Sequence, residues 1–494
     1  MIWKNRSGAA ENKIEFEYYP LFSYFREVKT MRGGCVMWNV LIISEHIAPA
    51  QAVGSIRWTK MAKFLSQTGK YRISVLTSEK DYDGNSLPAN HCPRDPLLQS
   101  DMRYFDQYIA VPETRALRWS YGIKKKLKGE INAAPRMSGA LGSARVPLRW
   151  MRRAFWTLSH LVLSHDWKDY LHWRAVKRYI DRYLELAEYD VIISTFGPGW
   201  PHWAASHIKR MNPAVVWIAD YRDPYYSQLT PAILRRRHKR FAITKTGSAD
   251  RIIAVSEEML PLLHLSSHQR ATVVPNGFDP SEAAPPKPPP RFSLVYTGTL
   301  YSMGTHFSDL SPAFAAVKAL IDEGTIQEKD VLLQYAGNKG DLFLAQATAC
   351  GLEKCTQDLG LLSRDAAMEL QREAAILLMA IWNNQEEQGV VTGKIYEYML
   401  SHKPILAVCN GDRPNSELKA MIERGALGFC YEEPTAEQDA LALKEWLKEM
   451  YLSWKGRGSL AFSPNEEYVR QFGYDRLAAR IDQIIEEGCG RRGS

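Results

Sequence analysis

The sequence predicts an α/β protein of two Rossmann-like, doubly wound domains with a cleft between them. Its 494 residues are enough for two domains with sizeable cores. Continuous apolar runs of strand length alternate with helical stretches in two separate series, a pattern typical of parallel sheets covered by helices. The stretch PPKPPPR, residues 285–291, lies between the two series. Such a stretch is stiff, extended and unable to join a sheet, so we expect it to be an interdomain linker.

Composition places the chain among globular proteins of the cytoplasm. It is 45% hydrophobic and 24% charged. No apolar run approaches the roughly 18 residues that span a bilayer, and the amino terminus lacks the apolar core of a secretory signal. The seven cysteines are scattered without a CxxC pair, which indicates reduced thiols and no metal site. A net charge of +8 favours an anionic partner without identifying it.

The first domain is expected to span residues 38–284, after an N-terminal extension at 1–37. Its opening βαβ unit has buried strands at 38–44 and 71–77 around a helix at 56–67, but it lacks the GxGxxG of dinucleotide-binding proteins. Gly54 and Ser55 directly precede the helix. In doubly wound sheets ligands bind at this end of the strand.

A basic, aromatic segment follows the predicted strand at 104–111. Residues 115–156 contain eleven Lys and Arg residues and a single acid, Glu130, with Trp, Tyr and Phe interleaved. This composition suits an anionic membrane surface. A flexible, solvated insertion is the open alternative. A nucleic-acid contact has no accompanying recognition motif, so we expect none.

Further elements complete the two series. In the first domain we expect a helix at 167–187, strands at 190–195, 214–220 and 251–255, and a short helix that begins at Ser256. The second domain, 292–460, has predicted strands at 294–297, 331–336, 375–380, 405–408 and 427–431, and helices at 312–322, 364–373 and 435–451. An amphipathic tail at 465–487 lies within the C-terminal segment 461–494.

The stretch GVVTGKIYEYMLSHKPILAV, residues 389–408, carries the clearest functional pattern. It predicts a turn, a helix from Lys394 that Pro404 stops, and a buried strand. Unpaired N–H groups at the start of a helix form a natural anion site. Lys394 and Glu397 share one face of this helix and are suited to a phosphate and a ribose diol. A capped surface helix with a weak ion pair is the alternative.

Seven phrases, in chain order, carry a family resemblance. They are DVIISTFGPGWPHWAA, WIADYRDPYY, ADRIIAVSEEM, VVPNGFDP, LVYTGTL, LQYAGN and TGKIYEYMLSHKPILAV. Together they resemble retaining, family-4-type nucleotide-sugar glycosyltransferases of the GT-B fold. Within that family they are most similar to the bacterial surface-polysaccharide branch. The resemblance covers about residues 38–485. It implies an acceptor in the first domain, a nucleotide sugar in the second, no cofactor and no essential metal, and a last helix that returns to the first domain.

The same resemblance assigns site residues. Glu397 resembles the carboxylate that holds the ribose, and Gly393 and Lys394 lie where the diphosphate is held. Gly298 resembles the glycine that opens the donor domain. Gly54 and Ser55 resemble the loop that approaches the donor phosphate, and His202 resembles the acceptor-side histidine.

The chain departs from the family pattern at two places. Gly389 stands where the family has a second glutamate, and the neighbouring Glu386 or Glu387 is the expected substitute. The segment after Gly298, TLYSMGTH, lacks the family's Arg and Lys. Backbone amides around Gly304 are the expected replacement.

The chemistry expected is transfer with retention. Lys394, Gly393 and Gly54 would stabilise the leaving diphosphate, which takes the acceptor's proton on the same face of the sugar. His202 would donate to a sugar hydroxyl, or else cap its helix. Asp220, Arg222 and Asp223 would touch the acceptor. Two alternatives for these three remain open, a self-satisfied Asp–Arg cluster and the acid/base pair of a hydrolase.

We therefore expect a cytoplasmic glycosyltransferase, peripheral on the inner face of the membrane. It would move a hexose-type sugar from a nucleoside diphosphate to a polysaccharide or lipid-linked acceptor. A nucleotide-sugar epimerase of the same fold is the second hypothesis. A catalytically weak scaffold subunit of a polysaccharide-assembly complex is the third, favoured by the departures at Gly389 and after Gly298.

Overall fold

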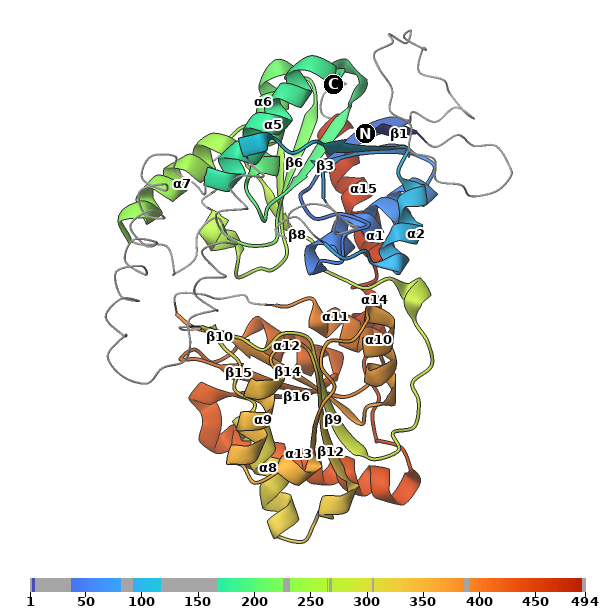
Figure 1. Ribbon diagram of the computed structural model, residues 1–494, viewed down its shortest axis with the longest axis vertical. Coiled ribbons are helices and arrows are strands. Elements are labelled where there is room, and N and C mark those ends of the chain that lie inside the picture. Colours follow the sequence, from blue (N-terminus) through green and yellow to red (C-terminus); the bar gives the residue numbers. More distant parts are fainter. Residues whose placement is uncertain are drawn as a thin grey trace. The chain divides into compact units, whose positions relative to one another are not determined.

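The chain forms two α/β units (Figure 1). The computed structural model describes residues 2–4, 37–80, 92–116, 167–224, 232–263, 265, 269–303, 306–385 and 391–490. The first unit comprises Met1–Val255, Met259–Val274 and Ala478–Ser494, and the second comprises Ser256–Glu258 and Pro275–Leu477. The prediction of two Rossmann-like α/β domains is confirmed.

The first unit contains an eight-stranded sheet of order β1-β4-β3-β2-β5-β6-β7-β8. All neighbours pair in parallel except β1 and β4, which are antiparallel. The strand order reverses between β2 and β5, the point at which ligands bind in doubly wound sheets. The strands are β1 Ile2–Lys4, β2 Trp38–Ile43, β3 Tyr71–Ser78, β4 Gln107–Val111, β5 Val191–Thr195, β6 Val216–Tyr221, β7 Arg251–Ala254 and β8 Ala271–Val273.

Helices cover the first sheet. They are α1 Val53–Gln67, α2 Pro96–Asp101, α5 Trp167–Tyr183, α6 Trp200–Met211 and α7 Ala232–Thr246, with short 3₁₀ turns at Met102–Tyr104, Leu186–Glu188 and Leu260–Leu263. Alternate strand residues such as Leu41, Ile43 and Trp217 pack in one core against Val176 of α5 and Trp203 of α6. Successive side chains of a strand point to opposite faces of the sheet, so every second residue contributes to this core.

The second unit contains a six-stranded parallel sheet of order β13-β12-β9-β14-β15-β16 and a small hairpin, β10-β11. The strand order reverses between β9 and β14. The strands are β9 Phe292–Thr297, β10 Ser302–Met303, β11 His306–Phe307, β12 Val331–Ala336, β13 Thr356–Asp358, β14 Ile376–Trp382, β15 Ile405–Asn410 and β16 Gly428–Glu432.

Two helical layers sandwich the second sheet. Its helices are α8 Ser311–Asp322, α9 Gly340–Ala349, α10 Arg364–Glu373, α11 Lys394–Leu400, α12 Glu417–Gly425, α13 Ala436–Arg457 and α14 Glu466–Arg470, with 3₁₀ turns at Pro280–Glu282, Glu328–Asp330, Glu353–Cys355 and Glu433–Thr435. Leu294 and Leu378 face α8 and α13, whereas Val295 and Leu377 face α11 and α12. Neighbouring residues of one strand thus pack into the two cores on opposite faces of the sheet.

The proline-rich stretch differs from the linker that the sequence predicts. Residues 285–291 belong to the second unit, because the chain passes between units at Val274–Pro275. Lys287 N donates to Arg372 O at 3.0 Å, and Trp454 Nε1 donates to Pro289 O at 3.0 Å. The prolines therefore lie as an extended strap against the second unit, in a place where no ladder hydrogen bonds are needed.

The expected tail is two helices, α14 and α15 (Tyr474–Gly490), separated near Gly473. From Ala478 onward α15 belongs to the first unit. There Arg480 Nη2 donates to Val273 O at 2.8 Å, and Lys70 Nζ lies 2.8 Å from an oxygen of Asp482.

Three further expectations differ locally. The N-terminal extension contains β1, an edge strand. The segment after Ser256 is a turn and a 3₁₀ helix rather than an α-helix. Gly54 and Ser55 lie inside the first turn of α1 rather than before it. None of the helices in the described part of the chain has the length and apolarity to cross a membrane.

Candidate functional site

The second unit brings Gly298 and Lys394 together at the carboxyl end of β9, beside the reversal of strand order. Gly298 has φ +105°, a conformation that favours glycine, and its N–H donates to Ala336 O at 2.7 Å. A Cβ at this position would lie 2.8 Å from Lys394 Cε and 3.2 Å from its Nζ. The glycine therefore leaves room for the lysine side chain.

Lys394 is held over an aromatic ring. Its Nζ donates to the Tyr296 hydroxyl at 2.6 Å and lies 3.8 Å from the centre of that ring. Burial lowers the pKa of Lys394 to about 7, against the opposing charge of Glu397. The charge of Glu397 thus only partly offsets the cost of burying the Lys394 ammonium, and a bound anion would offset the rest.

Glu397 lies one turn along α11 from Lys394. Burial raises the pKa of its carboxyl group, and the charges of Arg364 and Lys394 act in the opposite direction. Arg364 in turn pairs with Glu282 at 2.9 Å. A carboxyl group in this setting gains from hydrogen-bond donors such as the hydroxyls of a ribose.

A polar network behind Glu397 connects three elements. Gln371 of α10 is 1% exposed; its Nε2 donates to Thr297 Oγ1 at 2.9 Å, and its Oε1 accepts from Ser401 Oγ at 3.0 Å. Gln371 also forms a side-chain hydrogen bond that lowers the pKa of Glu397. The network fixes α11 against the end of β9, and sequence reasoning missed it.

The helix start itself contributes less than the sequence suggests. Gly393 is the N-cap of α11 and has no side-chain cap, but the helix has only seven residues. A helix of two turns gathers little of the dipole of a long one. Lys394, rather than the helix end, is the main cationic element of this group.

The first unit brings Gly54 and Arg222 together at the matching edge of its own sheet. A Cβ on Gly54 would overlap Nη1 of Arg222. Arg222 Nε donates to Phe196 O at 3.1 Å and its Nη2 donates to Gly197 O at 2.9 Å. The guanidinium is thereby fixed over the amino end of α1.

Glu45 and His46, directly after β2, join this group and were not predicted. Glu45 Oε2 accepts from Ser78 Oγ at 2.7 Å and from Trp200 Nε1 at 2.8 Å. Burial lowers the pKa of His46 to about 4, with help from the charge of Lys80. Their position at the carboxyl end of a switch-point strand was the signal that could have found them.

His202 is the third residue of α6 and is 0% exposed. Burial lowers its pKa to about 3, so the ring is neutral. Trp217 Nε1 donates to Ser194 Oγ at 2.8 Å, and that oxygen lies 2.8 Å from His202 Nδ1. His202 Nδ1 therefore shares a hydrogen bond with a hydroxyl group that is able both to donate and to accept. Within the described residues, Nε2 has no hydrogen-bond partner.

Asp220 differs from the expectation that it binds an acceptor. It is 0% exposed and pairs with Arg57 at 2.9 Å, and its other oxygen accepts from Trp58 Nε1 at 2.6 Å. Asp220 does pair with an arginine, as in the alternative of an Asp–Arg cluster. That arginine is Arg57 of α1 and not Arg222. Asp223, by contrast, is exposed beside Gly197.

Of the remaining predicted site residues, the structure describes Ser55 but not the loop residues near Gly304 and Gly389. Ser55 is 0% exposed, and its Oγ has no hydrogen-bond partner in the described part of the chain. Glu386, Glu387, Gly389 and Gly304 lie outside the described residues, as does 117–166, most of the basic segment 115–156. Among the residues that the structure describes, no group of three or more His, Cys, Asp or Glu side chains could hold a metal ion.

Comparisons with known proteins agree with this architecture. Residues 141–282 match the model of Glycosyltransferase Family 4. No curated protein sequence matches the chain. Sucrose-phosphate synthase (tll1590) from Thermosynechococcus elongatus is similar in structure, with a TM-score of 0.51 and 13% identity over 91% of this chain and 98% of that one.

Two other solved structures are similar over comparable lengths. The apo form of the lipopolysaccharide outer core galactosyltransferase WaaB has a TM-score of 0.52 and 10% identity, over 91% of this chain and 99% of that one. The alpha,alpha-trehalose 6-phosphate synthase from Burkholderia multivorans has a TM-score of 0.55 and 11% identity, over 92% and 100%. At such identities the likeness concerns the fold. The family match concerns residues 141–282 of the chain, and the structural likeness concerns its α/β fold.

Proposed function

We propose that the protein transfers a hexose-type sugar from a nucleoside diphosphate to a polysaccharide or lipid-linked acceptor, with retention and without a metal. The observation that carries this proposal is the desolvated ammonium of Lys394, packed on Gly298 and one turn from Glu397. An under-compensated cation beside a protonatable carboxyl suits a diphosphate attached to a ribose.

The proposed reaction exchanges one bond at the anomeric carbon for another. The bond from that carbon to the diphosphate oxygen breaks, and a bond to the acceptor oxygen forms on the same face. The acceptor's proton passes to the departing phosphate oxygen. Lys394 stabilises the charge that builds on this oxygen, a contribution commonly worth 10² to 10³ in rate. Glu397 holds the ribose hydroxyls.

The first unit is proposed to serve the acceptor and the reacting end of the donor. Arg222, fixed over Gly54, offers a cation and Ser55 offers a buried hydroxyl. His202 offers a neutral N–H to a sugar hydroxyl at any pH above its depressed pKa of about 3. Asp223 remains an acceptor contact in the proposal, and Glu387 a donor contact, whereas Asp220 is given the structural role of neutralising Arg57.

We also propose that the protein lies on the anionic inner face of the cell membrane. The basic segment 115–156 suggested this, and helix α7 supports it with described residues. Arg236, Lys239, Arg240, Ile243 and Thr244 are exposed at helical spacing and form one face of α7. Such a stripe gains about 1 kcal/mol per basic residue near an anionic surface.

A ligand screen followed by a transfer assay tests the proposal. UDP-, GDP- and ADP-sugars are compared by thermal shift, and one of them should raise the unfolding midpoint. Free nucleotide should then appear only when an acceptor glycan is present, and NMR of the product should show a retained anomeric configuration. Nucleotide released without acceptor, together with an inverted sugar hydroxyl, would instead identify an epimerase. Binding without any turnover would identify a scaffold subunit.

Lys394→Met is the decisive variant, and Lys403→Met is its matched control. Lys403 is also a buried lysine of the second unit, with a pKa lowered to about 8, but its Nζ donates to Lys287 O at 2.6 Å. We expect Lys394→Met to lose at least about 100-fold in transfer rate. Lys403→Met, once shown to be folded, should keep most of the rate. Equal rates for Lys394→Met and the unaltered protein would refute the assignment.

A further inference from the structure

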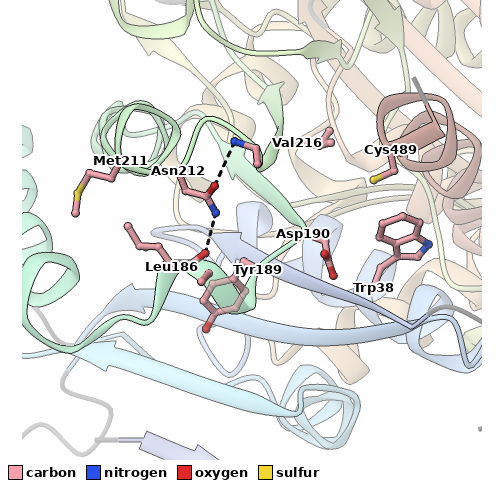
Figure 2. A pocket seen from close by; sticks show the side chains of 10 residues that line it. Trp38, Leu186, Tyr189, Asp190, Met211, Asn212, Val216 and Cys489 are labelled. Atoms are coloured by element: carbon pink, nitrogen blue, oxygen red, sulfur yellow. Dashed lines mark hydrogen bonds between the residues drawn. The ribbon is translucent and has the colours of Figure 1, made fainter. Parts of the chain in front are cut away.

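A pocket lies in the first unit, and none of the residues that line it was assigned above to sugar transfer (Figure 2). Its volume is about 680 Å³, within the range of small-molecule sites. Trp38 begins β2, Val216 begins β6, and Asp190 directly precedes β5, so the pocket lies at the amino-terminal edge of the sheet. The groups around Gly54 and His202 follow the opposite, carboxyl-terminal edge.

The charges around this pocket favour a cation. Its ten lining residues include one carboxylate, Asp190, and no lysine, arginine or histidine, although the chain has a net charge of +8. Two helices end on its wall, α6 at Met211 and α15 one residue after Cys489. The carboxyl end of a helix carries roughly half a negative charge and attracts cations.

Two basic residues directly precede Met211, and each has a partner that does not line the pocket. Lys209 Nζ pairs with Asp250 at 2.7 Å, and the exposed Arg210 donates through Nε to Ser206 O at 3.3 Å. The charge of Lys209 is therefore balanced by a carboxylate outside the pocket.

The walls are aromatic and apolar as well as anionic. Figure 2 shows Trp38, Asp190 and Cys489 toward one end of the pocket and Met211 and Asn212 toward the other. Trp38 is partly exposed and Met211 is 51% exposed. An indole face attracts a cation, and apolar walls suit the body that carries it.

Asn212 is not part of the recognition surface. Its Nδ2 donates to Leu186 O at 3.0 Å and its Oδ1 accepts from Ala214 N at 3.2 Å, so its amide closes the loop after α6. Asp190 Oδ2 accepts from Asn39 N at 3.0 Å. This bond holds the carboxylate in place at the start of β5.

We propose that this pocket binds a small organic cation, an amine or quaternary ammonium group on a compact apolar body. Trp38 would stack on the cationic group, Asp190 would balance its charge, and the aliphatic wall would cover its body. Anions would meet the helix ends and Asp190 at like charge. The site is separate from the groups assigned to sugar transfer and does not rest on that activity.

Choline and 3,3-dimethylbutan-1-ol test the proposal, because they share a shape and differ by the charge. Binding to the full-length protein is measured by calorimetry at matched ionic strength. We expect saturable binding of choline and binding of the neutral alcohol that is weaker by about tenfold, as a cation–π contact of 1 to 2 kcal/mol implies. Equal binding of the two compounds, or no saturable binding of choline, would overturn the proposal.

Two variants and one control locate the site. Trp38→Leu should weaken choline binding by about tenfold. Asp190→Asn should weaken it while its amide oxygen still accepts from Asn39 N. Trp446→Leu replaces a partly exposed tryptophan of the second unit and should leave choline binding unchanged. As an independent readout, choline should slow alkylation of Cys489 by iodoacetamide. Binding that survives Trp38→Leu, or alkylation that choline leaves unchanged, would place choline elsewhere and refute the site.

Discussion

Lys394 packs so closely on Gly298 that a Cβ at residue 298 would lie 2.8 Å from its Cε. The contact joins the carboxyl end of β9 to the first residue of α11. Tyr296 completes it, because its hydroxyl accepts from Lys394 Nζ at 2.6 Å. A glycine, an aromatic ring and a desolvated ammonium therefore act as one unit, and each can be altered separately.

Gly298→Ala should weaken donor binding by at least about tenfold, because the new methyl group displaces Lys394. It should also lower stability by about 1 to 2 kcal/mol, the cost of a Cβ at positive φ. Gly324→Ala is the matched control, since Gly324 has φ +70° and no atom within 4 Å of its Cβ position. The control should show the stability loss alone. Nucleotide titrations and chemical denaturation of both variants measure the two effects; equal donor affinity in both variants would contradict the prediction.

Donor affinity should fall as pH rises above about 7, because burial lowers the pKa of Lys394 to about 7 and the anion needs the charged form. The decline should approach tenfold per pH unit until the pKa of the complex is reached. Lys394→Arg keeps its charge throughout this range and should flatten the profile, even if its affinity is lower. Calorimetry in buffers of different ionisation enthalpy should also show proton uptake on binding. A pH profile that Lys394→Arg shares with the unaltered protein would remove Lys394 as its source.

Lys394→Met should be more stable than the unaltered protein. Burial lowers the folded-state pKa of Lys394 below the ordinary lysine value of 10.5, so the folded state holds its proton less tightly than the unfolded chain does. That penalty is complete below about pH 7 and disappears as pH rises toward the unfolded pKa. The gain in unfolding free energy should therefore be largest near neutral and acid pH and smallest in alkali. A gain that is independent of pH would point to packing rather than charge.

The sequence predicted the regular parts of the fold well. The expected strand at 331–336 is β12 and the expected helix at 364–373 is α10, because both have strong apolar periods and clear boundaries. Helix α7 was not predicted, since its arginine-rich stretch has no apolar stripe to reveal it. Strand order was also beyond reach, because pairings such as β2 with β5 join segments that are far apart in sequence.

The candidate site was predictable only where it is local. Lys394 and Glu397 stand three residues apart, so a helix was enough to place them on one face. Asp220 shows the opposite case: Arg222 is its neighbour in sequence, whereas the arginine that it pairs with, Arg57, is 163 residues away. The contact of Lys394 with Tyr296 spans 98 residues and likewise required the fold.

Gly54→Ala and Arg222→Ala should be strongly non-additive. Gly54 has no positive φ, so alanine there costs no backbone strain, but its Cβ would overlap the Arg222 guanidinium. Gly54→Ala alone should therefore displace Arg222 and destabilise the protein. In the Arg222→Ala background the same change should be nearly neutral. Urea denaturation of the four proteins gives the coupling, which we expect at about 1 kcal/mol or more. A coupling near zero would show that the overlap is relieved without moving Arg222.

Stability should fall with acidification in a way that His202 partly controls. Burial lowers the folded-state pKa of His202 to about 3 from the ordinary histidine value of 6.5; the charge of Asp220 opposes this shift and the charge of Arg222 adds to it. The unfolded chain then takes up a proton that the folded chain refuses. The stabilising effect of the neutral ring is complete above about pH 6.5 and is lost toward pH 3, at about 1.4 kcal/mol per pH unit.

His202→Gln should remove this part of the slope between about pH 6.5 and pH 5, whatever it does to stability at neutral pH. Denaturant midpoints and m-values of the two proteins across that range give the slopes directly. The slope is the informative quantity, because loss of the Ser194 contact, 2.8 Å in length, shifts both ends of the curve equally. His46, with a pKa lowered to about 4, leaves a residual slope of the same sign. If the variant keeps the full slope, the imidazole of His202 takes up its proton as readily in the folded protein as in the unfolded chain, and its role as a permanently neutral N–H donor fails.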